Sequence, residues 1–81
     1  MKQNFDEPKD FKKLSQLGYD YQAKRQFQKA LACSKQAYEI IKNQANSDDL
    51  NVALVNMGAI YWEMSQLRKA TNLFHDSLLI V

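Results

Sequence analysis

Residues 54–74 read LVNMGAIYWEMSQLRKATNLF, and this stretch decides the fold. Gly58 lies inside a strongly apolar helical pattern, and Ala70 and Phe74 follow it at fixed offsets. A glycine inside a helix costs about 1 kcal/mol relative to alanine, so its presence indicates a packing reason. We therefore predict that a second helix approaches closely where Gly58 and Ala70 leave room for it.

The rest of the chain also follows a helical pattern. Apolar residues recur every three or four positions, as on one face of an α-helix, in segments that cover residues 8–24, 27–44, 49–64 and 67–81. Polar breaks separate these segments at residues 24–26, 43–49 and 65–66. With only two glycines and one proline, the chain has few turn residues. The pattern predicts an all-α fold of four helices.

The expected helix ends carry capping residues. Asp6 or Glu7 is predicted to cap the first helix, and Pro8 suits its first turn because a missing N–H costs nothing there. Ser47 or Asp48 is predicted to cap the third helix, whose acidic start also suits the helix dipole.

The third helix is apolar nearly all round, which indicates burial on more than one side. Besides the stripe through Leu54, it carries a second stripe of residues with the spacing 0, 3, 7 and 10, namely Val52, Val55, Ala59 and Trp62. Two interpretations stay open for this second stripe. Neighbouring helices cover it as core, or it lines a ligand groove in which aromatic residues such as Trp62 and Tyr19 act as anchors.

Bulk properties limit the classes of function. The 81 residues make one small domain with an apolar fraction of 46% and a net charge of +2, which is too weak to indicate nucleic-acid binding. The charge is uneven: residues 1–45 carry nine basic and five acidic residues (+4), and residues 46–81 carry two and four (−2). This asymmetry fits ordinary solvated faces or head-to-tail association of unlike ends. We also expect residues 1–8 to be a flexible segment.

The remaining chemistry gives no indication of catalysis, a cofactor or a metal site. His75 has no second histidine or cysteine near it, and His75, Asp76 and Ser77 diverge on a helix, so they do not make a catalytic triad. Cys33 is the only cysteine and is expected to be a small, partly buried apolar residue in a reducing compartment. No apolar run approaches the ~20 residues that a membrane span requires. We expect a cytoplasmic, non-enzymatic protein.

The chain aligns with itself when it is shifted by 40 residues. From residue 14 onward, seven of the aligned pairs are identical, and their first members are Leu14, Gly18, Tyr21, Gln26, Lys29, Ala30 and Ile40. Most of them fall on the helix-packing pattern and the turn. A repeat of this length built from a helix pair predicts a solenoid, with one repeat in residues 9–45 and the next in residues 46–81.

This repeat resembles the tetratricopeptide repeat family, whose pattern is W-x2-L-G-x2-Y followed by Ala, x3, Phe and Pro. The second repeat matches with Leu54 in place of Trp and then Met57, Gly58, Tyr61, Ala70 and Phe74. The first repeat matches with Leu14, Leu17, Gly18, Tyr21 and Ala30, whereas Ser34 replaces Phe and Lys42 replaces Pro. The resemblance covers residues 11–81 and implies two stacked antiparallel helix hairpins.

The resemblance also implies that the first helix of each hairpin lines a concave groove that accepts an extended peptide or a helix. The groove positions of the first repeat are Lys12, Ser15, Gln16, Tyr19, Gln22 and Ala23. Those of the second repeat are Val52, Val55, Asn56, Ala59, Trp62 and Glu63. Some family members clamp a peptide C-terminal carboxylate with Lys and Asn at set groove positions. Here Ser15 and Tyr19 occupy two of those positions and only Asn56 matches, so such a clamp is not predicted.

The end of the chain has no polar capping helix, although solenoids usually need one and usually have at least three repeats. Apolar surface is expected at Phe74, Leu78, Leu79, Ile80 and Val81. Burying a Leu or Ile is worth about 1.5–3 kcal/mol, so this surface favours a homodimer or higher assembly if the 81 residues are the full chain. The sequence thus predicts a scaffold or adaptor that binds a protein or peptide. The alternatives are a self-assembling structural unit and, less favoured, a helical-repeat RNA binder, which salt-sensitive RNA affinity would reveal.

Overall fold

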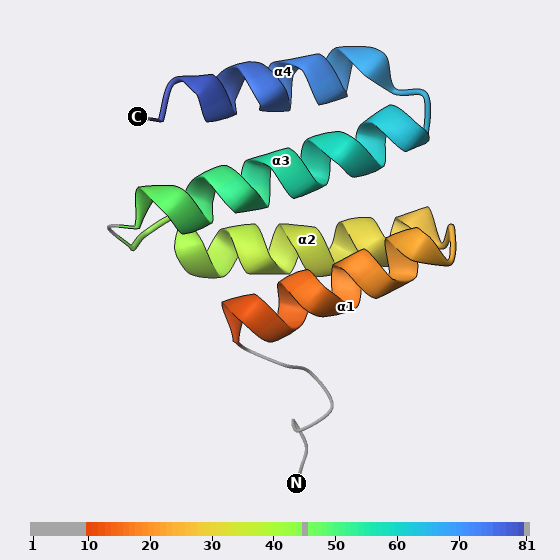
Figure 1. Cartoon of the computed structure of the whole chain (residues 1–81), viewed down its shortest axis with the longest axis horizontal. Coiled ribbons are helices and arrows are strands. Elements are labelled where there is room, and N and C mark those ends of the chain that lie inside the picture. The colour runs from red at the N-terminus through yellow and green to blue at the C-terminus, as the bar shows by residue number, and fades with distance from the viewer. Residues whose placement is uncertain (1–9, 45, 81) are drawn as a thin grey trace, which may run out of the picture.

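The computed structural model describes residues 10–44 and 46–80. Its helices are α1 (Phe11–Ala23), α2 (Phe27–Ile41), α3 (Ser47–Glu63) and α4 (Leu67–Leu78) (Figure 1). The helices α1 and α2 form one antiparallel hairpin, α3 and α4 form a second, and the hairpins stack through α2 and α3. The predicted all-α fold of two stacked hairpins is confirmed. The expected flexible segment at residues 1–8 lies outside the described residues.

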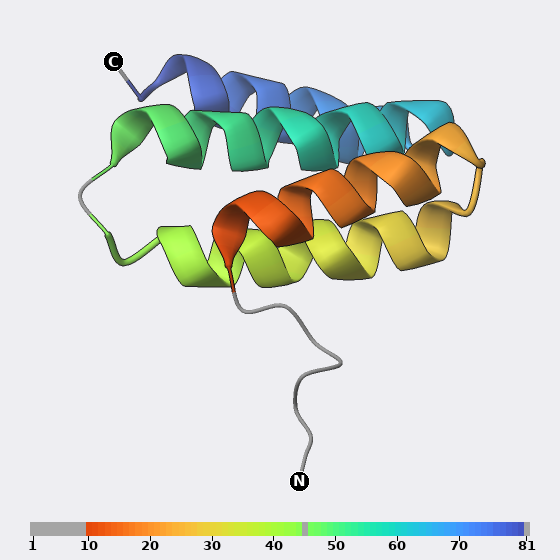
Figure 2. The same ribbon diagram turned by 60° about the horizontal axis from the view of Figure 1, so that its bottom comes forward.

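The two hairpins place equivalent helices in the same layer. Figure 2 shows α1 and α3 on the side of the viewer, with α2 and α4 behind them. The Cα atoms extend over 40 × 31 × 14 Å, so the molecule is a slab two helices thick. None of the helices within residues 10–44 and 46–80 is long and apolar enough to cross a membrane.

Both hairpin turns use the same backbone motif, 40 residues apart. Arg25 has φ 61° and Ser65 has φ 64°, both in the left-handed region. After each of them the backbone N–H of a glutamine donates back to a tyrosine carbonyl, from Gln26 to Tyr21 at 2.8 Å and from Gln66 to Tyr61 at 2.9 Å. These bonds belong to the Schellman motif, which ends a helix and satisfies its free carbonyls. The polar breaks at residues 24–26 and 65–66 of the sequence therefore correspond to tight turns in the structure.

Gly58 allows the close approach that the sequence predicts. A Cβ atom at Gly58 would lie 2.6 Å from Cε1 and 2.9 Å from Cδ1 of Phe74 on α4. Ala70, which precedes Phe74 by one helical turn, is fully buried. In the first hairpin, a Cβ at Gly18 would lie 3.1 Å from Ser34 Oγ and 3.3 Å from the Ala30 carbonyl oxygen. Ser34 occupies the position that Phe74 has in the second hairpin. In both hairpins the second helix therefore packs closely on a glycine of the first helix, but the side chain that contacts the glycine differs.

Lys29 and Lys69, which are equivalent in the 40-residue repeat, have the same structural role. Lys29 Nζ lies 5.7 Å from the centre of the Tyr21 ring, and Lys69 Nζ lies 5.4 Å from that of Tyr61. In each hairpin the lysine of the second helix thus covers the tyrosine of the first. These cation–π pairs join the two helices near the turn.

The structure corrects the predicted helix ends. Asp10, rather than Asp6 or Glu7, caps α1, because its carboxylate accepts hydrogen bonds from the backbone N–H groups of Lys12 and Lys13. Asn46, rather than Ser47 or Asp48, caps α3 through its side-chain oxygen, which accepts from the Asp49 N–H at 3.0 Å. In both cases several candidate capping residues lie within five positions of one another, and their order along the chain does not show which one adopts the extended backbone.

The spacing of apolar residues in the fourth helix also predicts one common face for Leu67, Ala70, Leu73, Phe74 and Leu78. The structure corrects this prediction, because Leu67 is 49% exposed and Leu78 is 75% exposed. The face that packs on α3 runs through Ala70, Leu73, Phe74 and Ser77 instead. Ser77 stays buried because its hydroxyl donates to the Phe74 carbonyl and its own carbonyl accepts from Asn51 of α3.

Candidate functional site

The sequence-predicted groove residues line the side of the molecule on which α1 and α3 lie next to each other (Figure 2). A first hollow of about 380 Å³ lies between the starts and middles of these helices. It is lined by Phe11, Lys12, Ser15, Gln16, Tyr19, Val52 and Asn56. Six of these seven residues were predicted from the sequence. Residues from both repeats therefore come together in one depression.

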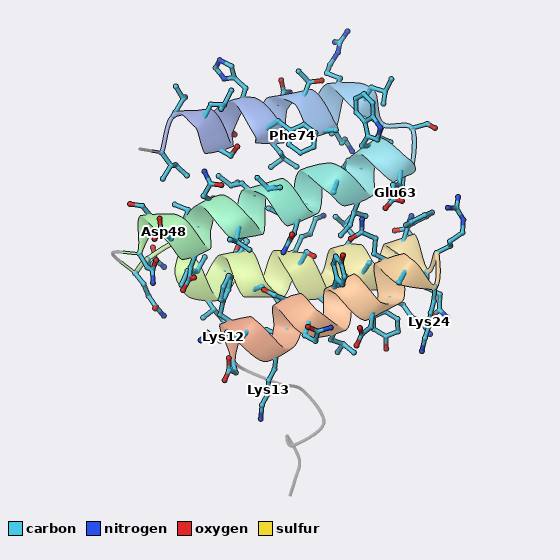
Figure 3. All side chains as sticks on the ribbon, in the orientation of Figure 1. Lys12, Lys13, Lys24, Asp48, Glu63 and Phe74 are labelled. Atoms are coloured by element: carbon cyan, nitrogen blue, oxygen red, sulfur yellow. The ribbon has the colours of Figure 1, made fainter. Side chains whose placement is uncertain are left out.

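Two further hollows continue toward the other end of the groove. A small one of about 220 Å³ is lined by Tyr19, Gln22, Ala23 and Glu63. The third, of about 370 Å³, is lined by Gln22, Ala59, Trp62, Glu63 and Phe74. The Gln22 amide donates a hydrogen bond to the Glu63 carboxylate and so links α1 to α3 between these hollows. Figure 3 shows Lys12 near the start of α1 and Glu63 near the end of α3, at opposite ends of the groove.

The second apolar stripe of α3 is largely open in the structure. Val52 is 45% exposed, Val55 38% and Trp62 56%, while Ala59 is half-buried. Tyr19 on α1 is 64% exposed. By contrast, Leu54, Met57 and Ile60 on the other side of α3 are buried. Val55 lies on the open side of α3 but lines none of the three hollows described above.

Ser15 lies at the edge of the first hollow with its hydroxyl directed into the protein. The Ser15 Oγ is buried and has no hydrogen-bond partner among residues 10–44 and 46–80. A buried hydroxyl without a hydrogen-bond partner costs about 1–3 kcal/mol of folding free energy. The equivalent residue of the second repeat is Val55.

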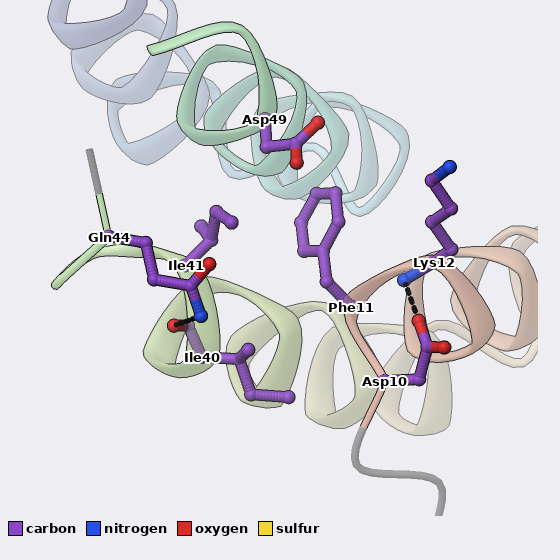
Figure 4. Close-up of a pocket in the computed structure, with 7 residues that line it drawn as sticks. All are labelled: Asp10, Phe11, Lys12, Ile40, Ile41, Gln44 and Asp49. Carbon is purple, nitrogen blue, oxygen red and sulfur yellow. Dashed lines mark hydrogen bonds between the residues drawn. The ribbon is translucent and has the colours of Figure 1, made fainter. Parts of the chain in front are cut away.

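The groove opens at one end into a larger depression that the sequence analysis missed. This hollow of about 740 Å³ lies where the start of α1, the end of α2 and the start of α3 meet. It is lined by Asp10, Phe11, Lys12, Ile40, Ile41, Gln44 and Asp49. In Figure 4, Phe11 points from α1 toward Asp49 of α3. Because Phe11 and Lys12 line both this depression and the first hollow, the depression and the hollow form a continuous surface. Phe11 also fits the apolar face of its helix, so nothing in the sequence marked it as a groove residue.

The residues of the predicted self-association surface differ in how much of each side chain is exposed. Leu78 and Leu79 are 75% and 70% exposed. Phe74 is half-buried against Gly58, and Ile80 is half-buried beside the core. Val81 lies outside the described residues.

The other reactive side chains stand apart from the groove. Cys33 is buried on α2, and burial raises the pKa of its thiol. His75 is exposed in the last turn of α4. Within the described part of the chain, no group of three or more His, Cys, Asp or Glu side chains is placed to hold a metal ion.

Comparison with known families agrees with this geometry. The family model described as tetratricopeptide repeat matches residues 11–80. The chain belongs to the tetratricopeptide repeat family. No curated protein and no solved structure matches it. Tetratricopeptide repeats are generally protein–protein interaction modules, and the hollows between α1 and α3 lie on the helices that the resemblance assigned to ligand binding.

Proposed function

We propose that this tetratricopeptide repeat protein is a non-enzymatic scaffold or adaptor that binds a peptide or helix of another protein in the groove between α1 and α3. The observation that carries the proposal is the division of α3 into two apolar stripes. The core covers Leu54, Met57 and Ile60, whereas Val52 and Trp62 stay open beside the hollows. An exposed aromatic residue flanked by apolar and amide groups is typical of a binding hot spot.

The spacing of the hollows suggests the kind of ligand. Val52 lines the first hollow and Ala59 the third, and seven residues along a helix span about 10 Å. Two apolar side chains seven residues apart on a helix cover the same distance, and so do two side chains three residues apart in a polyproline II peptide, which has three residues per turn. The amides of Gln16, Gln22 and Asn56 lie between or beside these positions and suit hydrogen bonds to the ligand backbone.

Selection from a displayed library of random 12-residue peptides, followed by affinity measurement with a selected peptide, tests this proposal. Val52→Glu and Trp62→Ala are each expected to weaken binding about tenfold or more, because each removes an apolar contact in one hollow. Ala32→Glu is the matched control, since Ala32 is an exposed helical position on α2. Equal affinity for all variants, or a chain that selects no peptide, would contradict the proposal.

Self-assembly is a second candidate function, and one observation favours it. Leu78 and Leu79 expose most of their side chains at the end of α4. In this case the chain forms a homodimer that buries them. Light scattering over a range of protein concentrations separates the two functions: a dimer that Leu78→Lys converts into a folded monomer supports self-assembly, and a monomer at all concentrations removes it.

We also propose that the protein is cytoplasmic, because a reducing compartment suits the free thiol of Cys33.

A further inference from the structure

Glu63, near the end of α3, borders two of the three hollows in the groove. The hollow of about 220 Å³ places it beside Tyr19 of α1, and the hollow of about 370 Å³ places it beside Trp62 of its own helix. Among the residues that line these two hollows, Glu63 is the one that carries a charge. A ligand that fills this end of the groove therefore meets a single carboxylate.

The chain itself does not neutralise this carboxylate. Within residues 10–44 and 46–80, the ion pair that forms joins Lys42 to Glu39 on α2, and none includes Glu63. Lys69 of α4 lies over the ring of Tyr61 instead, with its Nζ 5.4 Å from the ring centre. Figure 3 shows Lys24 pointing away from α3. The charge of Glu63 is thus available to a cation of the ligand.

The Glu63 carboxylate is held in place but keeps acceptor sites for a ligand. The amide of Gln22 on α1 donates a hydrogen bond to it. An ionised carboxylate has two oxygens with about four acceptor sites, so this bond leaves most of them free. The bond also orders the Glu63 side chain before any ligand arrives, which lowers the entropy that binding has to remove.

The walls beside Glu63 suit a long side chain with a charged end. In the hollow of about 370 Å³ the apolar walls come from Ala59, Trp62 and Phe74. Lysine and arginine lay their methylene stems along apolar surface and keep the charged group at a polar edge. The ring of Trp62 is exposed, and tryptophan is the side chain that attracts cations most strongly through its face.

Arginine fits this arrangement better than lysine. Its guanidinium is planar, stacks on aromatic faces and presents several N–H donors that can pair with both oxygens of a carboxylate. The lysine ammonium is a compact point charge that is more strongly hydrated. A site that combines an aromatic face with a carboxylate therefore favours the guanidinium.

This combination occurs at one end of the groove only. The residues 40 positions before Trp62 and Glu63 are Gln22 and Ala23, so the first repeat has neither the ring nor the charge there. At the other end of the groove, Lys12 lines the large depression together with two aspartates, Asp10 and Asp49. The charge recognition of a ligand is therefore concentrated at Glu63.

We propose that this end of the groove is a subsite for an arginine side chain of the partner protein. The guanidinium pairs with the Glu63 carboxylate and stacks on Trp62, and the methylene stem lies against Ala59 and Phe74. The same ligand carries an apolar side chain about 10 Å away for the hollow that Val52 lines. The inference rests on the proposed groove function and specifies the chemistry of the ligand.

Parallel selections from the library of random 12-residue peptides give the first test. The full natural chain is expected to enrich arginine at least threefold over its frequency in the library, and Glu63→Gln is expected to remove this enrichment. Glu63→Gln keeps an oxygen that accepts from Gln22, so the link between α1 and α3 persists. Asp76→Asn is the matched control and is expected to keep the enrichment, because Asp76 is an exposed acid on α4 outside the hollows.

Affinity measurements with one selected peptide give the second test. Citrulline in place of the arginine keeps the shape of the side chain and removes its charge. We expect this change to weaken binding to the natural chain about tenfold and binding to Glu63→Gln less than twofold, so that the two substitutions are coupled. Lysine at the same position is expected to weaken binding to the natural chain about threefold.

The outcomes separate the arginine subsite from the groove function. Peptides that bind the chain and lose affinity with Val52→Glu, yet show no preference for arginine, would overturn the subsite and leave the groove function standing. Equal effects of citrulline on the natural chain and on Glu63→Gln would also overturn the subsite, because the cation would then lie elsewhere. A chain that selects no peptide would contradict both proposals.

Discussion

At the scale of single residues, Gly58 and Phe74 explain each other. The ring of Phe74 occupies the place where any other residue at position 58 would have its Cβ atom. The first hairpin has Ser34 in place of Phe74, and the space above Gly18 is correspondingly less tight. The sequence predicted the close approach at Gly58 but not its partner atom, because that depends on how α4 rotates about its axis.

Gly58→Ala is expected to destabilise the protein by about 1–2 kcal/mol, because overpacking against Phe74 exceeds the gain in helix propensity. Gly18→Ala is expected to cost less, since its nearest neighbour is Ser34 Oγ at 3.1 Å. Urea unfolding of both variants measures the difference. The double-mutant cycle with Phe74→Ser is the control: the cost of Gly58→Ala should shrink in that background, and an unchanged cost would show that the ring is not responsible.

Because the thiol of Cys33 is buried, the free energy of unfolding is expected to change with pH in the alkaline range. Burial raises the pKa of the thiol in the folded chain, so its stabilising contribution is complete below the unfolded-state pKa of about 8.5 and is lost as the pH rises through the folded-state value. We expect the free energy of unfolding of the natural chain to fall between pH 8 and pH 10 relative to that of Cys33→Ala. Parallel denaturation curves of the two proteins across this range would contradict the assignment.

At the scale of elements, the two turns show what the sequence signals and what it hides. The polar breaks at residues 24–26 and 65–66 can be recognised in the sequence, and the structure has turns there. The left-handed conformation of Arg25 and Ser65 could not be predicted from the sequence, because glycine is the usual residue at such a position and neither turn contains one. The Schellman hydrogen bonds hold both residues in a conformation that costs a non-glycine residue about 1–2 kcal/mol.

Ser65→Gly is therefore expected to stabilise the protein by about 0.5 kcal/mol, the relief of this cost less the larger entropy of an unfolded glycine. Arg25→Gly is expected to gain less, because the Arg25 guanidinium lies 5.1 Å from the centre of the Phe27 ring and this contact is lost. Thermal unfolding of both variants measures the effect. Ser65→Ala is the control, since it keeps the Cβ atom; a Ser65→Gly variant no more stable than Ser65→Ala would refute the explanation.

The helix α3 shows a second limit of sequence reasoning at this scale. Both apolar stripes of α3 were visible in the sequence. The second stripe, however, was equally consistent with burial in the core and with the lining of a groove. The structure shows that the second stripe is not core: α2 and α4 cover the sides that carry Ile60 and Gly58, and the side that carries Val52 and Trp62 has no helix over it within the described residues. The spacing of apolar residues gives the stripes, and only the stacking of the hairpins shows which stripe is open.

At the scale of the whole molecule, the repeat determined most of what could be predicted. The 40-residue offset predicted a solenoid of two helix pairs, and the resemblance to tetratricopeptide repeats implied their stacking as antiparallel hairpins and the helices that line the groove. The groove itself depends on contacts between repeats, such as the Gln22–Glu63 hydrogen bond, which no periodicity reveals. The depression beside Phe11 was missed for the same reason, because its walls come from three helices.

The most direct test of the proposed groove is a map of backbone amide chemical shifts of the full chain, recorded while a selected peptide is added. The largest changes are predicted at residues 12–23 of α1 and 52–63 of α3, with smaller changes in α2 and on the outer face of α4. Changes concentrated instead at residues 27–41 or 67–79, with α1 and α3 unaffected, would contradict the claim that the chain binds its partner between its first and third helices.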